Sequence, residues 1–574
     1  MSAKEMKQLL EVARGEVRAE IVLRNGKIIN VLSGEIHEGD IAISGNRIAG
    51  IGAYDGDQVI DLKGSYIAPS FIDGHIHLES TMLSVKEFVR AVVPRGTGGC
   101  VCDPHEFANV AGTAGIDYIL SAQGSLPLDL YVMMSSCVPA TPLETAGASI
   151  SVEQIGEYLH KPGITGIAEM MNFPGVFLGW ESEINKIAQA QGRPIDGHSP
   201  ALTGKNLDAY IAAGITSDHE CTSADEARDK LRRGMHILIR EGTAERNMHD
   251  LLPLVTPANA RHFSFATDDK HPASLMDEGH IDNHVREALA FGLDPVIVFQ
   301  MASLNTARHY RAMHRGAIAP GYYADLVVFD NLADVRIRSV YKNGYLVAQD
   351  GEYLGSTDVP PVPGKLLNTI NTAPFTADDF KIAANGAAKM KVIEIIPRQI
   401  VTKAVIEDCT SANGQVTADT ERDILKLSVI ERHNATGNIG TGFVRGFGMK
   451  EGALASTVAH DAHNIVVVGT NDEDMAAAVH ELIRIGGGLC VVRNNEVLES
   501  LPLPIAGLVS DKPLEEVRAK EDALKAAAKT CGCTLSDPFM TLSFLALSPI
   551  PALKVTDQGL VDAEKFELTN LFVE

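Results

Sequence analysis

The stretch from Ala68 to Ser80, APSFIDGHIHLES, carries the strongest fold signal in the chain, because a strand-like run there ends in His75 and His77. Side chains alternate across a strand, so residues two apart point to the same face and both imidazoles can bind one metal ion. Two histidines in a loop or in a hydrogen-bonded core would give the same pattern. The pair therefore predicts a metal half-site whose other ligands must come from later strands.

The segment from Pro69 to Arg315 alternates short apolar strands with helical stretches, which is typical of repeated βα units around a parallel sheet. Almost every strand ends in polar or ionisable residues, as expected where the carboxyl ends of barrel strands form a catalytic face. Eight units over about 250 residues predict an α/β fold of the (β/α)8 TIM-barrel type. The eight candidate strands are SYIAPSFIDGHIH, GGCVCDPHE, LDLYVMMSSCVPA, GITGIAEMMN, RPIDGHSP, GITSDHE, MHILIREG and HFSFATDD.

The segments on both sides of this barrel consist of short strands broken by glycine, with Asn-Gly and Gly-Asn pairs that favour hairpins. We expect residues 1–68, which begin with a helix, and residues 316–358 to form one small β-sandwich domain. The barrel of residues 69–315 is then an insertion in that domain. A proline-rich linker, VPPVPGK at 359–365, precedes a separate C-terminal α+β domain predicted for residues 367–574.

The composition excludes several classes of function. The chain has 574 residues, and its 74 acidic and 50 basic residues give a net charge of −24, which repels phosphate backbones and anionic membrane surfaces. We therefore expect no nucleic-acid partner and no membrane association. The amino terminus does not resemble a signal peptide, and no stretch approaches the about 18 uncharged apolar residues of a membrane span. We expect a cytoplasmic protein, in which the eight cysteines stay reduced.

Side chains with metal-binding chemistry follow the histidine pair at later strand ends. They are Glu169 in GIAEMMN, His198 in IDGHSP, His219 in SDHE and Asp268 in FATDD. Each of them alone has a structural alternative, such as a buried group satisfied by a neighbour. Together, four imidazoles and two carboxylates suit two divalent ions that share one carboxylate and activate a water molecule. Nitrogen and oxygen ligands without thiolate suit manganese, iron or zinc.

This order of ligands resembles the amidohydrolase superfamily of metal-dependent hydrolases. Many of its binuclear members carry a carboxylated lysine on the fourth strand, where this chain has Glu169. Within the superfamily, the chain closely resembles the bacterial adenine deaminase family, in which a glutamate takes that bridging place. The resemblance rests on PSFIDGHIHLESTM, VCDPHEFANV, SSCVPA, GIAEMMNFPGV, LDAYIAAGI, LIREGTAERN and EGHIDNHVR in the barrel, and on GFGMKEGALASTVAHDAHNIVVVG, GGGLCVVRN, LPLPIAGL and DPFMTLSFLALSPIPALKVT after it.

The resemblance implies hydrolytic deamination of adenine to hypoxanthine and ammonia by a metal-bridging hydroxide, a reaction of purine salvage. It also implies two divalent ions, manganese (Mn2+) first or iron (Fe2+), and the ligand types leave Zn2+ as a further alternative. Asp268 would bind one ion and accept the proton of the attacking hydroxide. The ring nitrogen N1 must gain a proton as C6 becomes tetrahedral, and within the DPHE segment we favour Glu106 for this transfer over Asp103 and His105.

Other polar side chains are candidates for supporting roles. Arg240 and Glu241 end the seventh strand and suit either a substrate contact or a structural ion pair. Glu79 follows the histidine pair and is a candidate for orienting a ligand or a bound water. The substrate-binding candidates are Asp103, His105, Arg240 and Glu241. In the C-terminal region a polar cluster, which would serve as a lid or as a subunit contact, comprises Ser456, His460, Asp461 and His463.

Two other functions compete with adenine deamination. A hydrolase of the dihydropyrimidinase type, acting on a cyclic amide, would share the barrel and the metals but normally uses the carboxylated lysine that this chain lacks. A non-catalytic scaffold on the same fold is the second alternative, and retention of all six ligand positions argues against it. For the assembly, a symmetric homodimer is the commonest expectation.

Overall fold

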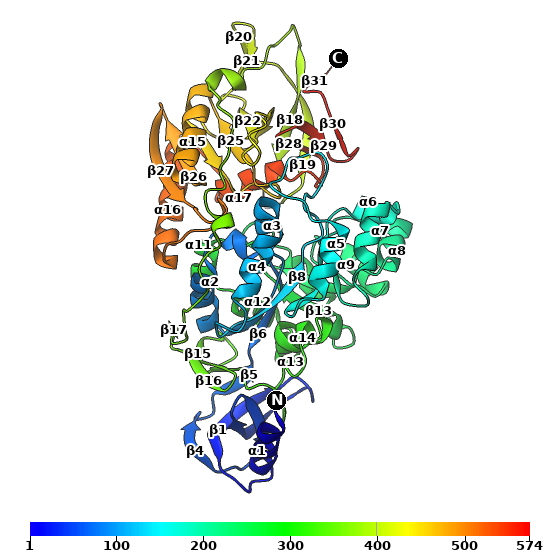
Figure 1. The fold of residues 1–574 in the computed structure, drawn as a ribbon, viewed down its shortest axis with the longest axis vertical. Helices are drawn as coiled ribbons and strands as arrows, with labels where there is room; N and C mark the ends of the chain where they lie inside the picture. The colour runs from blue at the N-terminus through cyan, green and yellow to red at the C-terminus, as the bar shows by residue number, and fades with distance from the viewer. Residues whose placement is uncertain (398, 574) are drawn as a thin grey trace.

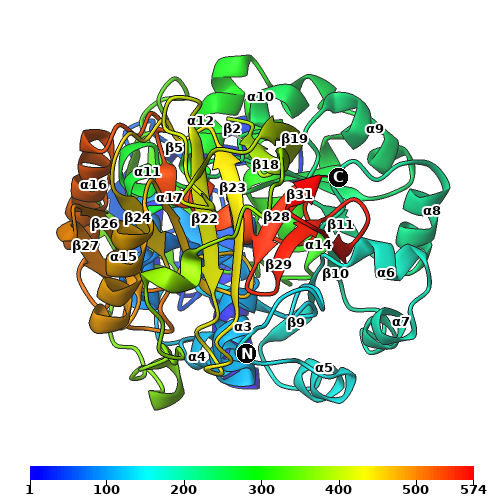
Figure 2. The same cartoon turned by 90° about the horizontal axis from the view of Figure 1, so that it is seen from above.

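The computed structural model describes residues 1–397 and 399–573. Figure 1 shows the N-terminal strands at one end of an elongated molecule, the barrel in the middle and the C-terminal strands at the other end. Seen from above, the C-terminal strands lie across the barrel (Figure 2). Within the described residues, no helix is both long and apolar enough to cross a membrane.

The segments on both sides of the barrel join in one nine-stranded sheet, in the order β17-β16-β15-β14-β5-β1-β2-β3 with β4 paired to β1. Strand β14 runs antiparallel to β5, with Val327 opposite Ala68, so the two segments pair directly. Asn343 and Gly344 have positive φ in the turn between β15 and β16, as an Asn-Gly pair predicts. The elements are α1 (Ala3–Ala13), β1 (Ala19–Asn30), β2 (Glu35–Ser44), β3 (Arg47–Ile51), β4 (Gly56–Asp61), β5 (Tyr66–Pro69), β14 (Leu326–Phe329), β15 (Ile337–Lys342), β16 (Tyr345–Gln349) and β17 (Glu352–Tyr353).

Eight parallel strands form the barrel, β6 to β10 as one sheet and β11 to β13 as a second. The sheets meet on both sides: Thr216 N donates to Ile195 O at 2.9 Å, and Asp268 N donates to His75 O at 2.9 Å. The predicted barrel is therefore confirmed. Its strands are β6 (Phe71–Ile76), β7 (Thr97–Cys102), β8 (Asp129–Met134), β9 (Ile164–Met170), β10 (Ile195–Gly197), β11 (Ser217–Asp218), β12 (His236–Arg240) and β13 (Phe263–Ala266).

One strand prediction is corrected. SYIAPSFIDGHIH is two strands, because Tyr66–Pro69 pairs with the N-terminal sheet as β5 and Phe71–Ile76 enters the barrel as β6. Ser70 between them donates its backbone N–H to Asp325 O at 3.0 Å, outside either strand. Both strands are buried, so the apolar pattern continues from one to the other and does not mark the break between them.

Helices connect the barrel strands and pack against them, and the burial pattern follows the strand period. Val101, Met133 and Ala168 from three neighbouring strands pack together with Tyr310, whereas their neighbours in sequence pack with the helices. The main barrel helices are α2 (Val85–Val92), α3 (His105–Ala111), α4 (Thr113–Ser121), α5 (Val152–Leu159), α6 (Phe173–Phe177), α7 (Glu181–Ala188), α8 (Gly204–Ala212), α9 (Ala224–Arg232), α10 (Met248–Leu251), α11 (Pro272–Asp277), α12 (Ile281–Phe291), α13 (Pro295–Phe299) and α14 (Asn305–His309).

The C-terminal region is α+β, as predicted, with a nine-stranded sheet in the order β19-β18-β23-β22-β25-β24-β26-β27 and β31 paired to β18. Gly486, at φ 79°, ends α15 in a tight turn to β26. The elements are β18 (Lys389–Ile395), β19 (Thr402–Asp408), β22 (Ile424–Ile430), β23 (Ile439–Arg445), β24 (Ala453–Ser456), β25 (Ile465–Gly469), α15 (Asp472–Ile485), β26 (Gly488–Arg493), β27 (Glu496–Pro502), α16 (Leu514–Thr530), α17 (Pro538–Ser543), β28 (Leu553–Thr556), β29 (Gly559–Asp562), β30 (Glu567–Leu568) and β31 (Phe572–Val573).

Candidate metal centre and active site

The six predicted ligand side chains come together at the carboxyl ends of the barrel strands. They stand at or just after the ends of β6, β9, β10, β11 and β13, where the alternation of the strands turns them inward. All six are buried, at most 5% exposed. These residues are His75, His77, Glu169, His198, His219 and Asp268.

The first half of the centre is the histidine pair. His75 Nε2 and His77 Nε2 lie 3.2 Å apart, and Asp268 Oδ1 lies 3.1 Å from His77 Nε2 and 3.5 Å from His75 Nε2. Two nitrogens bound to one ion at about 2.0–2.1 Å each are about 3 Å apart, so this spacing fits a shared cation. His77 Nδ1 donates to Asp103 O at 3.0 Å, which leaves the lone pair of Nε2 facing the centre.

Glu169 lies between the two halves of the centre. Its Oε1 is 3.2 Å from His77 Nε2, and its Oε2 is 2.7 Å from His198 Nδ1 and 3.3 Å from His219 Nε2. The two oxygens thus face different histidine pairs, which is the geometry that a bridging carboxylate needs. Overlapping groups of these donors lie within 4.8 Å of one another, so the residues fit divalent cations.

The electrostatics of the cluster also suit cations. Burial raises the pKa of both carboxylates, but the field of His198 at Glu169, and of His219 and Arg240 at Asp268, outweighs it. Each pKa is therefore well below its ordinary value, so both groups are anionic donors at neutral pH. Arg240 Nη1 lies 2.6 Å from Asp268 Oδ2 and holds that carboxylate in place.

Asp103 and His105, two of the candidate substrate contacts, lie beside the centre at the start of α3. His105 Nδ1 is 3.1 Å from Asp103 Oδ2 and 3.4 Å from Glu169 Oε1. Asp103 Oδ1 also accepts from Ser135 Oγ at 3.1 Å. This pair is therefore held in a fixed orientation next to the bridging position.

Glu106 is fully buried and does not itself line the central cavity. Its Oε1 accepts from Ser80 Oγ at 2.8 Å and lies 3.1 Å from His460 Nδ1. Burial opposes ionisation of Glu106, but the charge and hydrogen bond of His460 lower its pKa below the ordinary value. His460 does line the cavity, so Glu106 reaches the cavity through this histidine.

Glu79 does not contact a ligand histidine. Its Oε1 accepts from Phe107 N at 3.0 Å, which ties the segment after β6 to α3. Burial and the neighbouring charge of Glu106 raise the pKa of Glu79 to about 8. Its contacts are those of an anchor for α3.

Arg240 and Glu241, which are adjacent in sequence, have different surroundings. Arg240 lines the cavity and also pairs with Glu220, whose Oε2 accepts from Nη2 at 3.1 Å. Glu241 lies outside the cavity lining, with Oε1 3.6 Å from Arg246 Nη1 and Oε2 accepting from Met248 N at 3.4 Å. These contacts favour the structural alternative for Glu241, an ion pair, over a substrate contact.

The C-terminal region closes the cavity over the metal centre. Asp461 Oδ1 lies 3.5 Å from His105 Nε2, and the ring of His460 stacks on Phe544 with centroids 4.8 Å apart. Ser456 lies behind this wall and donates to Val458 O at 2.8 Å. The C-terminal residues that line the cavity are Ile400, His460, Asp461, Phe544 and Leu547. Of the two roles considered for the polar cluster, the contacts favour the lid.

Sequence reasoning missed several residues of the cavity. Glu220 and Asp269 directly follow the predicted ligands His219 and Asp268, so their position next to a strand end could have indicated that they lie in the cavity. Glu245 lies in the loop after β12, and neither of its buried oxygens has a partner among the described residues. Ile400, Phe544 and Leu547 gave no signal, because their packing on the barrel depends on contacts distant in sequence.

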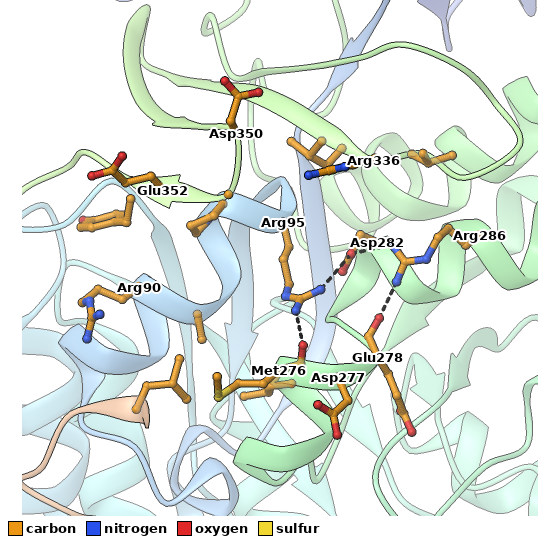
Figure 3. A pocket seen from close by; sticks show the side chains of 18 of the residues that line it. Arg90, Arg95, Met276, Asp277, Glu278, Asp282, Arg286, Arg336, Asp350 and Glu352 are labelled. Atoms are coloured by element: carbon orange, nitrogen blue, oxygen red, sulfur yellow. Dashed lines mark hydrogen bonds and ion pairs between the residues drawn. The ribbon is translucent and has the colours of Figure 1, made fainter. Parts of the chain in front are cut away.

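A second, wider cleft lies between the barrel, the N-terminal sheet and α16 (Figure 3). Within it, Arg95 and Arg286 both pair with Asp282, at 3.5 and 2.6 Å. The described residues that line it include no histidine or cysteine. Within the described part of the chain, this cleft therefore offers no imidazole or thiolate ligand for a metal ion.

Comparison with known proteins agrees with this architecture. The sequence profile of the amidohydrolase family matches residues 66–347, and the profile of the adenine deaminase C-terminal domain matches residues 399–567.

The chain is 48% identical to an adenine deaminase of Dehalococcoides mccartyi over 98% of both chains. It is 48% identical to adenine deaminase 2 of Carboxydothermus hydrogenoformans over 98% of this chain and 99% of that one. An adenine deaminase of Brucella anthropi is 43% identical over 98% of this chain and 99% of its own. Because both profiles match in this order and the relatives align over almost their whole length, the chain belongs to the adenine deaminase family of amidohydrolases.

Proposed function

We propose that this protein catalyses the hydrolytic deamination of adenine to hypoxanthine and ammonia. The observation that carries the proposal is the C-terminal region, which matches the adenine deaminase C-terminal domain and supplies His460, Asp461 and Phe544 to the wall of the cavity. The names of the relatives, which align over nearly the full length, support the same substrate.

The donor set supports two divalent ions, with Mn2+ first and Fe2+ or Zn2+ as alternatives. His75, His77 and Asp268 would hold one ion, His198 and His219 the other, and Glu169 would join them. Bound ions would acidify a water molecule at neutral pH and polarise the reacting carbon.

The residues around the centre supply the proton transfers. Water adds across the C6–N1 bond of adenine, so N1 must gain a proton and the amine must gain another before ammonia leaves. Asp268, kept anionic by Arg240, takes one proton from the attacking water and gives it to the amine. Glu106 supports the transfer to N1. Asp103 and His105 are proposed to orient the purine ring, because they lie between Glu169 and the C-terminal wall.

The test is to incubate the manganese-loaded protein with adenine and to follow ammonia release together with the purine absorbance. Both signals should change in step. Opening of a cyclic amide without any reaction of adenine would overturn the proposal in favour of a hydrolase of the dihydropyrimidinase type. That alternative is not favoured, because Glu169 stands where such enzymes normally carry a carboxylated lysine.

We also propose the division of the chain into residues 1–68 and 316–358, 69–315, and 367–574, which the separate sheets support. A homodimer remains the proposed assembly. All eight cysteines are free, which supports a cytoplasmic location, where thiols stay reduced.

A further inference from the structure

His460 belongs to the C-terminal region but packs against the barrel. It follows β24, and its Nδ1 lies 3.1 Å from Oε1 of Glu106 on α3. His460 is 3% exposed and Glu106 is 0% exposed, so no bulk water separates them. A buried hydrogen bond of this kind, in which one partner is a carboxylate, is stronger and more directional than one between neutral groups.

The orientation of the His460 ring is fixed on a second side. The ring stacks on Phe544 at an interplanar angle of 17°, and the backbone N of His460 donates to Ser543 O at 3.1 Å. With Nδ1 directed at Glu106, the other ring nitrogen, Nε2, points elsewhere. This atom is buried, has no hydrogen-bond partner among the described residues, and belongs to a side chain that lines the cavity.

A metal ion is a poor explanation for this cluster. The donor atoms of Glu106, His460 and His463 lie within 4.8 Å of one another, as in a three-ligand site. However, His463 Nδ1 accepts a hydrogen bond from Ala459 N at 3.1 Å, so the ring proton of neutral His463 is on Nε2. A protonated nitrogen cannot bind a metal, which leaves hydrogen bonding as the function of the group.

The arrangement is the one used to activate a histidine as an acid or base: a carboxylate holds one ring nitrogen, and the other faces the substrate. Glu106 and Asp269 also raise the pKa of His460 to about 9, although burial opposes this shift. The histidine therefore carries a proton to give at neutral pH. The other titratable groups near it are Asp461 and the neutral His463.

We propose that His460 is a catalytic residue, which transfers a proton from Nε2 to the ring nitrogen of the purine while Glu106 orients it. This inference rests on the proposed function. As the water oxygen bonds to C6 and the C6–N1 double bond opens, Nε2 gives its proton to N1, and Asp268 takes a proton from the water. When the C6–amine bond breaks, Asp268 gives its proton to the amine, and His460 regains one from the C6 hydroxyl as the carbonyl forms. All protons and bonds balance for one water consumed and one ammonia released.

The experiment compares His460→Ala and His460→Gln with the wild type, all loaded with manganese. Both variants should keep their metal content and lose about 100- to 10,000-fold in kcat with little change in KM, because a glutamine amide can donate a hydrogen bond but cannot exchange a proton. His433→Ala is the matched control: this histidine of the same region contacts Ala462 O at 2.7 Å and does not line the cavity. It should keep nearly full kcat.

A His460→Gln variant with near-wild-type kcat would overturn the catalytic role. An equal loss of kcat in His433→Ala would also overturn it, because the loss would then come from a change in loop structure and not from a missing proton donor. If His460→Ala does not fold, the test rests on His460→Gln, because glutamine is closer to histidine in size and polarity. A wild-type enzyme that leaves adenine unchanged contradicts the proposed function itself, so the two failures are distinguished by which protein is inactive.

Discussion

Arg240 and Asp268 form a buried ion pair, with Nη1 2.6 Å from Oδ2, at the edge of the metal centre. Asp268 has two tasks in the proposed reaction, metal binding and proton transfer, and both need an anion. Arg240 gives it a fixed positive neighbour that does not depend on the ions. The same guanidinium binds Glu220, so a single arginine links two carboxylates of the cavity.

Replacing Arg240 by methionine should therefore reduce both stability and activity. Removing one partner of a buried ion pair costs about 3–5 kcal/mol, since the remaining charge is left without compensation. The free energy of unfolding from urea titration and kcat/KM with adenine would measure the two effects. Arg246→Met, at a half-buried arginine paired with Glu241, is the control and should change kcat/KM little. Unchanged kcat/KM in Arg240→Met would show that Asp268 does not need this pair.

Glu169→Gln should lower metal content as well as rate. The amide has no negative charge and only one acceptor oxygen, so it cannot serve both histidine pairs, and the rate should fall by at least about 100-fold. Metal analysis by plasma spectrometry, done alongside the ammonia assay, reads both quantities. Glu241→Gln, the same change outside the cavity lining, should keep full metal content. Complete occupancy in Glu169→Gln would contradict the bridging role.

Glu106→Gln should separate rate from metal binding. Because Glu106 contacts Ser80 and His460 but none of the six ligands directly, its variant should keep both ions. Loss of the carboxylate removes the group that orients the proton donor, and kcat should fall about 100- to 10,000-fold. Asp103→Asn and His105→Asn, assayed in the same way, show whether either of these neighbours has the larger effect. An active Glu106→Gln enzyme removes this residue from the mechanism.

The barrel and the gathering of the six candidate ligands at its mouth were predictable because local signals specify them. Short apolar runs define the strands, and candidate ligands such as His198 and His219 stand at their carboxyl ends, where position alone brings them together. The break at Ser70 was not predictable, since β5 and β6 are both apolar and only their pairing with different sheets separates them. The wall formed by Phe544 and His460 depends on how two distant regions dock, and no local pattern encodes that.

The docking of the C-terminal region includes a buried ion cluster. His271, in the loop after β13, has Nδ1 3.3 Å from Asp537 Oδ2 and 3.6 Å from Glu521 Oε1. Lys525 completes the group, with Nζ 2.6 Å from Glu521 and 2.8 Å from Asp537. His271 is the barrel's cationic contribution to this contact, so its charge should help to hold the C-terminal region over the cavity.

This cluster predicts how stability depends on pH. Burial opposes the charged form of His271, but Asp537 and Glu521 raise its pKa from 6.5 to about 10. A raised pKa in the folded state means that the stabilisation is fully present below the unfolded value of about 6.5 and is lost as the pH rises through about 10.

His271→Gln should thus lower the thermal midpoint most at pH 6, by the equivalent of about 1.5–3 kcal/mol for a charged hydrogen bond. The difference from wild type should shrink steadily up to pH 10. Thermal melts of both proteins between pH 6 and 10 measure it, and a difference that stays constant across this range would mean that the proton on His271 contributes nothing to the docking.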